Sequence, residues 1–124
     1  MYIFRLFKAD DPITAIDARL LADGILKIGR DPASDWVMID PSCEISREHL
    51  TVRVSGGDLI LNCKGANGVF DDLSDERLPN EQDLPLVVPT AFRLGPYRMV
   101  AEPAPQAAHD RAGDNFGTLL MRLP

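Results

Sequence analysis

One stretch of this sequence, Gly29 to His49, brings together side chains that suit a phosphate group. A glycine-arginine pair follows a short aliphatic run, and a serine, an arginine and a histidine then fall within four positions, Ser46 to His49. The guanidinium fork matches the oxygens of a phosphate, and hydrogen bonds with a charged partner are the strong ones. Small hydroxyl donors beside such cations complete the set. We therefore predict a loop surface that recognises a phosphate group.

The same side chains allow two other chemistries. Ser46 and His49 are the components of a hydrolase dyad, but no strand-to-helix elbow precedes the serine and no partner acid is evident. Cys43, His49 and Cys63 are metal-ligand types, but they lack close paired spacing and a fourth ligand. An enzyme is therefore a distant third hypothesis, and we expect no metal site and no cofactor.

Short strands must position these residues. Before residue 103, alternating or aliphatic runs recur about every ten residues with almost no helical periodicity, which is typical of a β-sandwich or barrel. We expect strands at 2–7, 14–21, 25–28, 36–39, 49–54, 59–62, 85–88, 92–94 and 97–101, with a hairpin turn at Gly56-Gly57-Asp58. The acidic segment 71–84 shows no periodicity and predicts a long surface loop. The fold class is all-β.

Strand parity indicates which loops can meet. Successive connections of an antiparallel meander alternate between its two ends, and one hairpin separates the loops that contain Ser46 and Asn67. These two residues are therefore expected to be neighbours. The same counting puts the loop that contains Arg30 at the opposite end, unless the short strand at 36–39 is an edge stub and the chain doubles back. Parity alone leaves the position of Arg30 open.

Length and charge limit the class of protein. The chain has 124 residues, enough for one domain, and a formal net charge of -6 with a pI near 4.7 argues against a nucleic-acid partner. No apolar run approaches the roughly 20 residues that span a bilayer, so direct membrane insertion is not expected. The start of the chain does not resemble a secretory signal, and Cys43 and Cys63 are the only cysteines. We expect free thiols and a cytoplasmic location.

The motifs together resemble the forkhead-associated (FHA) domain, a phosphothreonine-binding β-sandwich of the SMAD/FHA type. The marks of that family are glycine-arginine after a strand, serine followed three residues later by histidine, and asparagine-glycine in a further loop. Here Gly29-Arg30, Ser46 with His49, and Asn67-Gly68 occur in that order with similar spacing. The resemblance covers residues 1–102 and implies two twisted, mostly antiparallel sheets with the three loops gathered at one end. Residues 103–124 would be a Pro/Ala-rich linker and an apolar C-terminal tail.

The resemblance implies a role for each matching residue. The phosphopeptide-binding residues would be Arg30, Ser46, Arg47 and Asn67, and the residues that support the site would be Gly29, His49 and Gly68. Arg30 and Ser46 would bind the phosphate directly, and Arg47 would add a second cation. Asn67 would hydrogen-bond the peptide backbone, and His49 would brace the loop that contains Ser46. The two glycines would allow the backbone geometry of their loops.

A narrower resemblance suggests a biological context. Ile28-Gly29-Arg30, Asp35-Trp36-Val37, Asp40-Pro41, Ile45-Ser46-Arg47 and Asn67-Gly68-Val69-Phe70 look like the FHA domains associated with bacterial type VI secretion systems. This implies a bacterial signalling role. The partners would be phosphothreonine-containing proteins, including secretion-system components phosphorylated by a Ser/Thr kinase.

Two departures from the family pattern affect the expected binding. Ala66 stands before Asn67 where many members have serine or threonine, so one hydroxyl contact to the phosphate would be missing. The acidic run at 71–76 replaces a compact turn, and it predicts a preference against acidic partners. The missing hydroxyl leaves a second hypothesis open, a scaffold of the same fold that binds a protein surface without phosphate.

Overall fold

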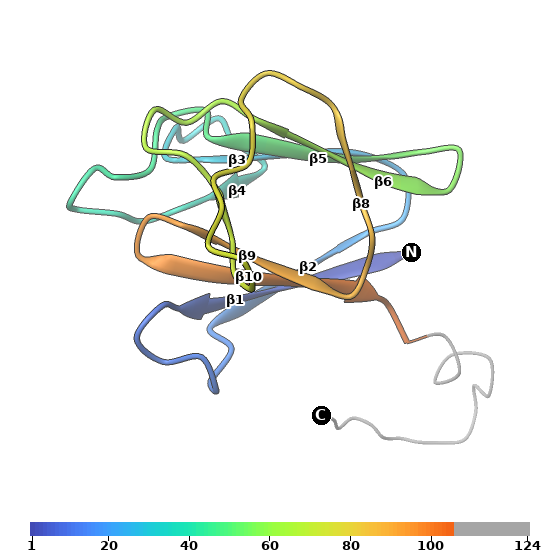
Figure 1. Cartoon of the computed structure of the whole chain (residues 1–124), viewed down its shortest axis with the longest axis horizontal. Coiled ribbons are helices and arrows are strands. Elements are labelled where there is room, and N and C mark those ends of the chain that lie inside the picture. The colour runs from blue at the N-terminus through green and yellow to red at the C-terminus, as the bar shows by residue number, and fades with distance from the viewer. Residues whose placement is uncertain (106–124) are drawn as a thin grey trace.

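The computed structural model describes residues 1–105, which form two layers of β-sheet (Figure 1). The strands are β1 (Tyr2–Lys8), β2 (Asp17–Leu21), β3 (Gly24–Gly29), β4 (Trp36–Val37), β5 (Leu50–Ser55), β6 (Asp58–Cys63), β7 (Phe70–Asp71), β8 (Leu84–Leu86), β9 (Thr90–Leu94) and β10 (Tyr97–Pro103). One sheet has the order β2-β1-β10-β9-β7 and the other β4-β3-β5-β6-β8. Among the strand pairings of residues 1–105, only that of β3 with β4 is parallel. The predicted all-β sandwich of two mostly antiparallel sheets is confirmed.

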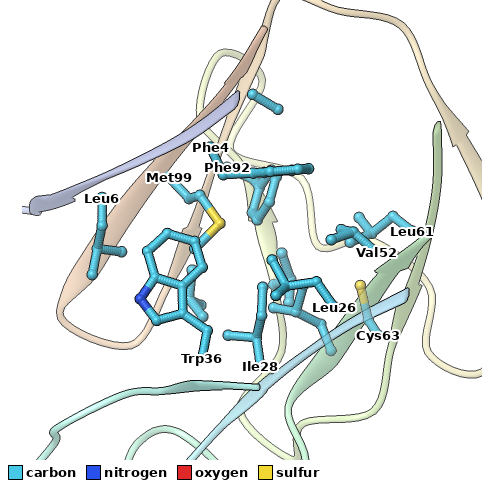
Figure 2. Packing of buried hydrophobic residues seen from close by; sticks show 14 of the residues in the cluster. Phe4, Leu6, Leu26, Ile28, Trp36, Val52, Leu61, Cys63, Phe92 and Met99 are labelled. Atoms are coloured by element: carbon cyan, nitrogen blue, oxygen red, sulfur yellow. The ribbon is translucent and has the colours of Figure 1, made fainter. Parts of the chain in front are cut away.

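Alternating side chains explain how the two sheets pack. In β3, Leu26 and Ile28 are buried while Ile25 and Lys27 are exposed, because successive side chains of a strand point to opposite faces. The same period in the other long strands fills the space between the layers (Figure 2). The main core residues are Phe4, Leu6, Leu26, Ile28, Trp36, Leu50, Val52, Leu59, Leu61, Cys63, Phe92, Leu94, Met99 and Ala101.

Trp36 ties the two sheets together at one side of the sandwich. Its indole packs close to Ile28 and Met99 (Figure 2) and is 1% exposed. The indole N–H donates a hydrogen bond to Oδ2 of Asp17 at 3.0 Å, and the Arg19 guanidinium lies 5.0 Å from the ring centroid. Because β4 and β2 are edge strands of different sheets, these contacts close that side.

The parallel pairing of β3 with β4 decides where the loops lie. Ile28 pairs with Trp36 and Gly29 with Val37, so the chain doubles back and leaves β4 in the direction in which it left β3. The β4–β5 loop therefore starts at the same end as the β3–β4 loop. The β5–β6 hairpin turn lies at the opposite end, on the right in Figure 1. Strand parity left two positions open for the loop that contains Arg30. The chain doubles back between β3 and β4, so this loop lies at the same end as the start of the loop that contains Ser46.

Three predicted strands are shorter in the structure, and the one predicted at 85–88 is the three-residue β8, Leu84–Leu86. The strand predicted at 14–21 begins at Asp17, because the preceding segment forms a loop in which the Ile13 N–H bonds the Asp11 carboxylate. The strand predicted at 36–39 ends at Val37, because the chain turns away there and leaves Ile39 76% exposed. The alternation of apolar residues in the sequence does not reveal where such a turn ends the hydrogen bonding between two strands.

The segment 71–84 is more ordered than predicted. Strand β7, which the sequence did not predict, precedes a tight turn, and an isolated bridge joins Phe70 to Arg77. Leu78 packs against the core, and its N–H donates to the carbonyl of Val69 at 2.8 Å. The prediction of a long surface loop holds for residues 72–83, which contain no strand and are mostly exposed. Leu78 and Leu84 pack against the core, and two such residues produce no periodicity in the sequence.

The chain beyond the last strand is described only to residue 105. β10 extends to Pro103, and the buried Ala104 donates its N–H to the carbonyl of Met1 at 3.0 Å. The predicted apolar tail lies outside the described residues. Within residues 1–105, we find no helix with the length and apolar character that crossing a bilayer requires. Cys43 is exposed, Cys63 is buried, and both thiols are free.

Candidate functional site

Three loops meet at one end of the sandwich, those after β3, β4 and β6, on the left in Figure 1. Backbone hydrogen bonds join the first two, because the Arg30 N–H donates to the Ser46 carbonyl and the Asp31 N–H to the Arg47 carbonyl, each at 3.1 Å. The carbonyl of His49 accepts two amide hydrogen bonds from the start of the β6–β7 loop, at 2.8 and 3.0 Å. The three sequence motifs therefore share one surface.

The Arg30 guanidinium is held on one side and open on the other. Its Nε–H donates to the carbonyl of Ile45 at 2.8 Å, while neither terminal NH₂ group has an acceptor among residues 1–105. The preceding Gly29 allows the two loops to approach, because a Cβ there would lie 2.0 Å from the Arg47 carbonyl oxygen. The close approach of the two loops and the bond to Ile45 thus fix the orientation of the Arg30 side chain.

Ser46 lies between the second and third loops. Its Oγ accepts a hydrogen bond from the Ala66 N–H at 3.0 Å, and among the described residues nothing accepts a bond from the hydroxyl itself. The hydroxyl is therefore oriented by its neighbour and still able to donate. This arrangement places an open hydroxyl donor beside the loop that contains Arg30.

Arg47 is the most exposed cation of the group. Its side chain is 71% exposed, and Nη2 lies 3.3 Å from Oδ2 of Asp31. A hydrogen bond from the Ala33 N–H, together with this arginine, lowers the pKa of Asp31 below its usual value. Asp31 was not selected from the sequence. It holds Arg47 near the site and competes with any anion for it.

His49 connects the loops from inside the molecule. The imidazole is 0% exposed, and its Nδ1 accepts the Ser46 backbone N–H at 2.9 Å. Nδ1 must have a free lone pair to accept this N–H. The ring proton therefore sits on Nε2, which donates to the Gly68 carbonyl at 2.9 Å. Burial lowers the pKa of His49 and keeps the ring neutral.

This bonding also shows what His49 does not do. Its Nδ1 is occupied by the backbone of Ser46 rather than by the hydroxyl, and Nε2 is occupied by Gly68. A general base for a serine nucleophile must hydrogen-bond the hydroxyl oxygen. Ser46 and His49 therefore do not form a hydrolase dyad in this geometry. No cluster of metal-ligating side chains occurs within the part of the chain that the structure describes.

The carbonyl groups of the β6–β7 loop are held from outside the loop. Besides His49 on Gly68, the Asn80 Nδ2 donates to the Gly65 carbonyl at 3.2 Å and the Arg77 Nη2 to the Ala66 carbonyl at 3.1 Å. Because these three carbonyl oxygens already accept hydrogen bonds, the loop offers an anion N–H donors rather than acceptors. Asn80 and Arg77 lie in the segment predicted as a long surface loop, and they were not selected from the sequence.

Asn67 stands at the exposed tip of this loop. Its Nδ2 donates to the Glu44 carbonyl at 3.0 Å, which fixes the amide and leaves Oδ1 without a donor among residues 1–105. The following Gly68 has a φ of +86°, a conformation that glycine adopts easily. Gly65 has a different constraint, because a Cβ there would lie 2.1 Å from the His49 ring. Gly65 was not selected from the sequence as a site residue.

Asp40 shapes the loop that contains Ser46. The buried carboxylate accepts the N–H groups of Ser42 at 3.0 Å and of Ile45 at 2.8 Å. Burial favours the neutral carboxyl, but these hydrogen bonds prevail and lower the pKa of Asp40. The Asp-Pro-Ser order is a turn signature that could have identified this role of Asp40 from the sequence.

The sandwich and its loops define a class of protein, an all-β module in which three loops at one end present cationic, hydroxyl and amide groups. The family model of the FHA domain matches residues 26–95, more than half of the chain. The chain therefore belongs to the FHA domain family, whose members are interaction modules. No curated protein matches the chain at a significant level.

Solved structures of FHA domains share this fold. An FHA domain studied for phosphothreonine-dependent interactions is 21% identical, with a TM-score of 0.65 over 85% of this chain and 98% of that one. The N-terminal FHA domain of S. cerevisiae Rad53p, in complex with a phosphothreonine peptide, is 19% identical, with a TM-score of 0.65 over 82% and 94%. The FHA domain of the Chlamydia trachomatis CT664 protein is 17% identical, with a TM-score of 0.68 over 84% and 98%. Identities this low establish the fold alone.

Proposed function

We propose that this chain is a phosphothreonine-dependent protein interaction module. The observation that carries the proposal is the pairing of Arg30 with Ser46. The Arg30 N–H bonds the Ser46 backbone, and both side chains keep donors without acceptors among residues 1–105. Two of the solved FHA domains described above are associated with phosphothreonine recognition, which supports the same reading.

Each site residue has a defined part in the proposed binding. The terminal NH₂ groups of Arg30 and the hydroxyl of Ser46 donate to the phosphate oxygens, and Arg47 leaves Asp31 to add a second cation. Asn67 accepts a peptide N–H through Oδ1. Gly29, His49 and Gly68 keep the loops in place through close approach and the two hydrogen bonds of the imidazole.

The magnitudes are consistent with a module that needs both phosphate and peptide contacts. Hydrogen bonds to charged groups contribute roughly 1.5 to 3 kcal/mol each, and a micromolar complex requires about 8 kcal/mol in total. Phosphate contacts from Arg30 and Ser46 supply part of this sum. Contacts with the peptide beyond the phosphate supply the rest and determine which partners bind.

Calorimetry with a phosphothreonine peptide library tests the proposal. We expect Arg30→Ala to lower the affinity of the selected peptide by about 100-fold or more, because charge-assisted hydrogen bonds are lost. Arg53→Ala is the matched control, since Arg53 lies on β5 and pairs with Asp83. Unchanged affinity in Arg30→Ala, or equal binding of the unphosphorylated peptide, would contradict the proposal.

We further propose that the partners belong to a bacterial type VI secretion system. The support is the sequence resemblance around Ile28-Gly29-Arg30 and Asn67-Gly68-Val69-Phe70. The bound proteins would be cytoplasmic secretion-system components phosphorylated by a Ser/Thr kinase. Affinity capture from cells with and without the kinase tests this context, and capture of unrelated proteins alone would overturn it.

A second candidate is a scaffold that binds its partner without phosphate. Ala66 favours this candidate, because its methyl group offers no hydroxyl to a phosphate bound at Ser46. Phosphatase treatment of the captured partner separates the two functions. Loss of capture after treatment supports phosphothreonine recognition, and unchanged capture supports the scaffold.

A further inference from the structure

Part of the acidic run at 71–76 is paired with arginines outside the proposed site. Asp72 lies 3.3 Å from Nε of Arg93 and 2.9 Å from Nε of Arg98, and Asp75 pairs with Arg93 as well. Phe92 and Leu94 beside Arg93, and Met99 beside Arg98, are buried, so these arginines belong to the outer face of their sheet. Asp71 accepts the turn N–H of Ser74 at 2.8 Å. Arginine partners therefore compensate Asp72 and Asp75, whereas Asp71 and the exposed Glu76 form no ion pair among residues 1–105.

Arg77, which follows this run, lies against the β6–β7 loop. Its Nη2 donates to the Ala66 carbonyl at 3.1 Å, and its Nε lies 2.6 Å from the position that a Gly68 Cβ would occupy. The guanidinium therefore contacts the residues on both sides of Asn67. It is exposed, and no carboxylate of residues 1–105 forms an ion pair with it.

The surroundings of Asn67 are consequently asymmetric in charge. The Asn67 amide is bonded to the backbone of Glu44, whose carboxylate is exposed. The Arg77 guanidinium contacts Ala66 and Gly68, the neighbours of Asn67, and most of its N–H groups have no acceptor among residues 1–105. A peptide bonded to Asn67 meets a cation where the sequence alone predicted repulsion of acidic partners.

We propose that Arg77 is a specificity-determining residue, which selects phosphothreonine partners with a carboxylate side chain close to the phosphothreonine. This inference rests on the proposed function and adds to it a partner chemistry. It replaces the expectation, drawn from the acidic run, that acidic partners are disfavoured. The physical reason is that the Arg77 guanidinium contacts the loop that contains Asn67 and electrostatic energy grows as distance shortens, while the paired carboxylates of Asp72 and Asp75 contribute little.

Anisotropy titrations of the full chain test this inference with matched phosphothreonine peptides. Each peptide carries Glu, Gln or Lys singly at each position on either side of the phosphothreonine. We expect Glu at one or more positions to bind about two- to fivefold more tightly than Gln, the range typical of exposed ion pairs. Lys at the same positions is expected to bind more weakly than Gln. Added salt should reduce both differences.

Variants of Arg77 assign the preference to this side chain. R77Q should remove the Glu-to-Gln ratio, R77E should invert it in favour of Lys, and R77K should retain it. R53Q is the control, because it removes the same charge from β5, where Arg53 pairs with Asp83.

Three outcomes would overturn the inference. The first is a Glu-to-Gln ratio that survives in R77Q, and the second is an equal loss for all peptides in R77Q, which would reveal loop support alone. Either result leaves the proposed function intact. The third is failure of the unaltered chain to bind any phosphothreonine peptide, which would overturn the proposed function together with this inference.

Discussion

The backbone N–H of Ser46 donates a hydrogen bond to Nδ1 of His49 at 2.9 Å, within the same loop. The other ring nitrogen bonds the Gly68 carbonyl of a different loop, also at 2.9 Å. One buried imidazole thus fixes two loops relative to each other, in its neutral form only. The proposed binding surface depends on the protonation state of a residue that no ligand contacts.

Stability should therefore decrease as the pH falls below about 6.5, the ordinary pKa of histidine. Burial lowers the pKa of His49 in the folded state, so between this lowered pKa and about 6.5 the unfolded chain binds the extra proton. The free energy of unfolding is then constant above this window and falls within it by up to about 1.4 kcal/mol per pH unit. Urea denaturation across the window measures the slope.

His49→Gln is the comparison for this pH dependence. The variant has no titrating ring at this position, so the difference between it and the unaltered chain isolates His49. If the variant does not fold, an NMR titration of the His49 ring in the unaltered chain gives its pKa directly. A ring that titrates at or above about 6.5 would contradict the prediction.

Gly65→Ala should destabilise the domain and weaken phosphopeptide binding. The added Cβ would lie 2.1 Å from the His49 ring, which two hydrogen bonds hold in a buried position. Overpacking of this kind costs about 1 to 3 kcal/mol in the free energy of unfolding. Urea denaturation and peptide titration measure the two effects.

Gly24→Ala separates crowding from backbone strain. Gly24 has a φ of +82° and nothing within 4 Å of the added Cβ, so the substitution strains the backbone without crowding His49. We expect a stability loss with unchanged peptide affinity. Equal losses of affinity in Gly24→Ala and Gly65→Ala would show that the contact with His49 is not responsible.

Ala66→Thr should strengthen phosphothreonine binding. The Ala66 N–H bonds Oγ of Ser46 at 3.0 Å, so a hydroxyl on this residue is within reach of a phosphate held there. One added hydrogen bond is worth about 0.5 to 1.5 kcal/mol, or roughly a two- to tenfold gain in affinity. Calorimetry with phosphorylated and unphosphorylated peptides measures it.

Ala66→Val is the matched control, because valine has the shape of threonine without the hydroxyl. A gain limited to Ala66→Thr and to the phosphorylated peptide supports the phosphate site. An equal gain in Ala66→Val would point to packing instead. No change in either variant would show that residue 66 does not face the phosphate.

Local chemistry made much of the fold predictable. Alternation along Leu26 and Ile28, and the Gly56-Gly57 turn, depend on neighbours in sequence, so the hairpins and the all-β class follow from short-range patterns. Strand ends were predicted less well, because they depend on turns such as the one that leaves Ile39 exposed. The Arg30, Ser46 and Asn67 motifs were also recognisable, since their residue types and order are visible in the sequence.

Tertiary structure alone decided where these residues lie and which charges act on them. Strand parity did not determine the position of Arg30. The parallel pairing of β3 with β4 places Arg30 beside Ser46. The sequence shows the acidic run but not that Arg93, more than fifteen residues later, neutralises part of it and that Arg77 stays unpaired among residues 1–105. Residue types define the available chemistry, whereas pairing between distant strands defines distance, and electrostatic and hydrogen-bond energies depend on distance.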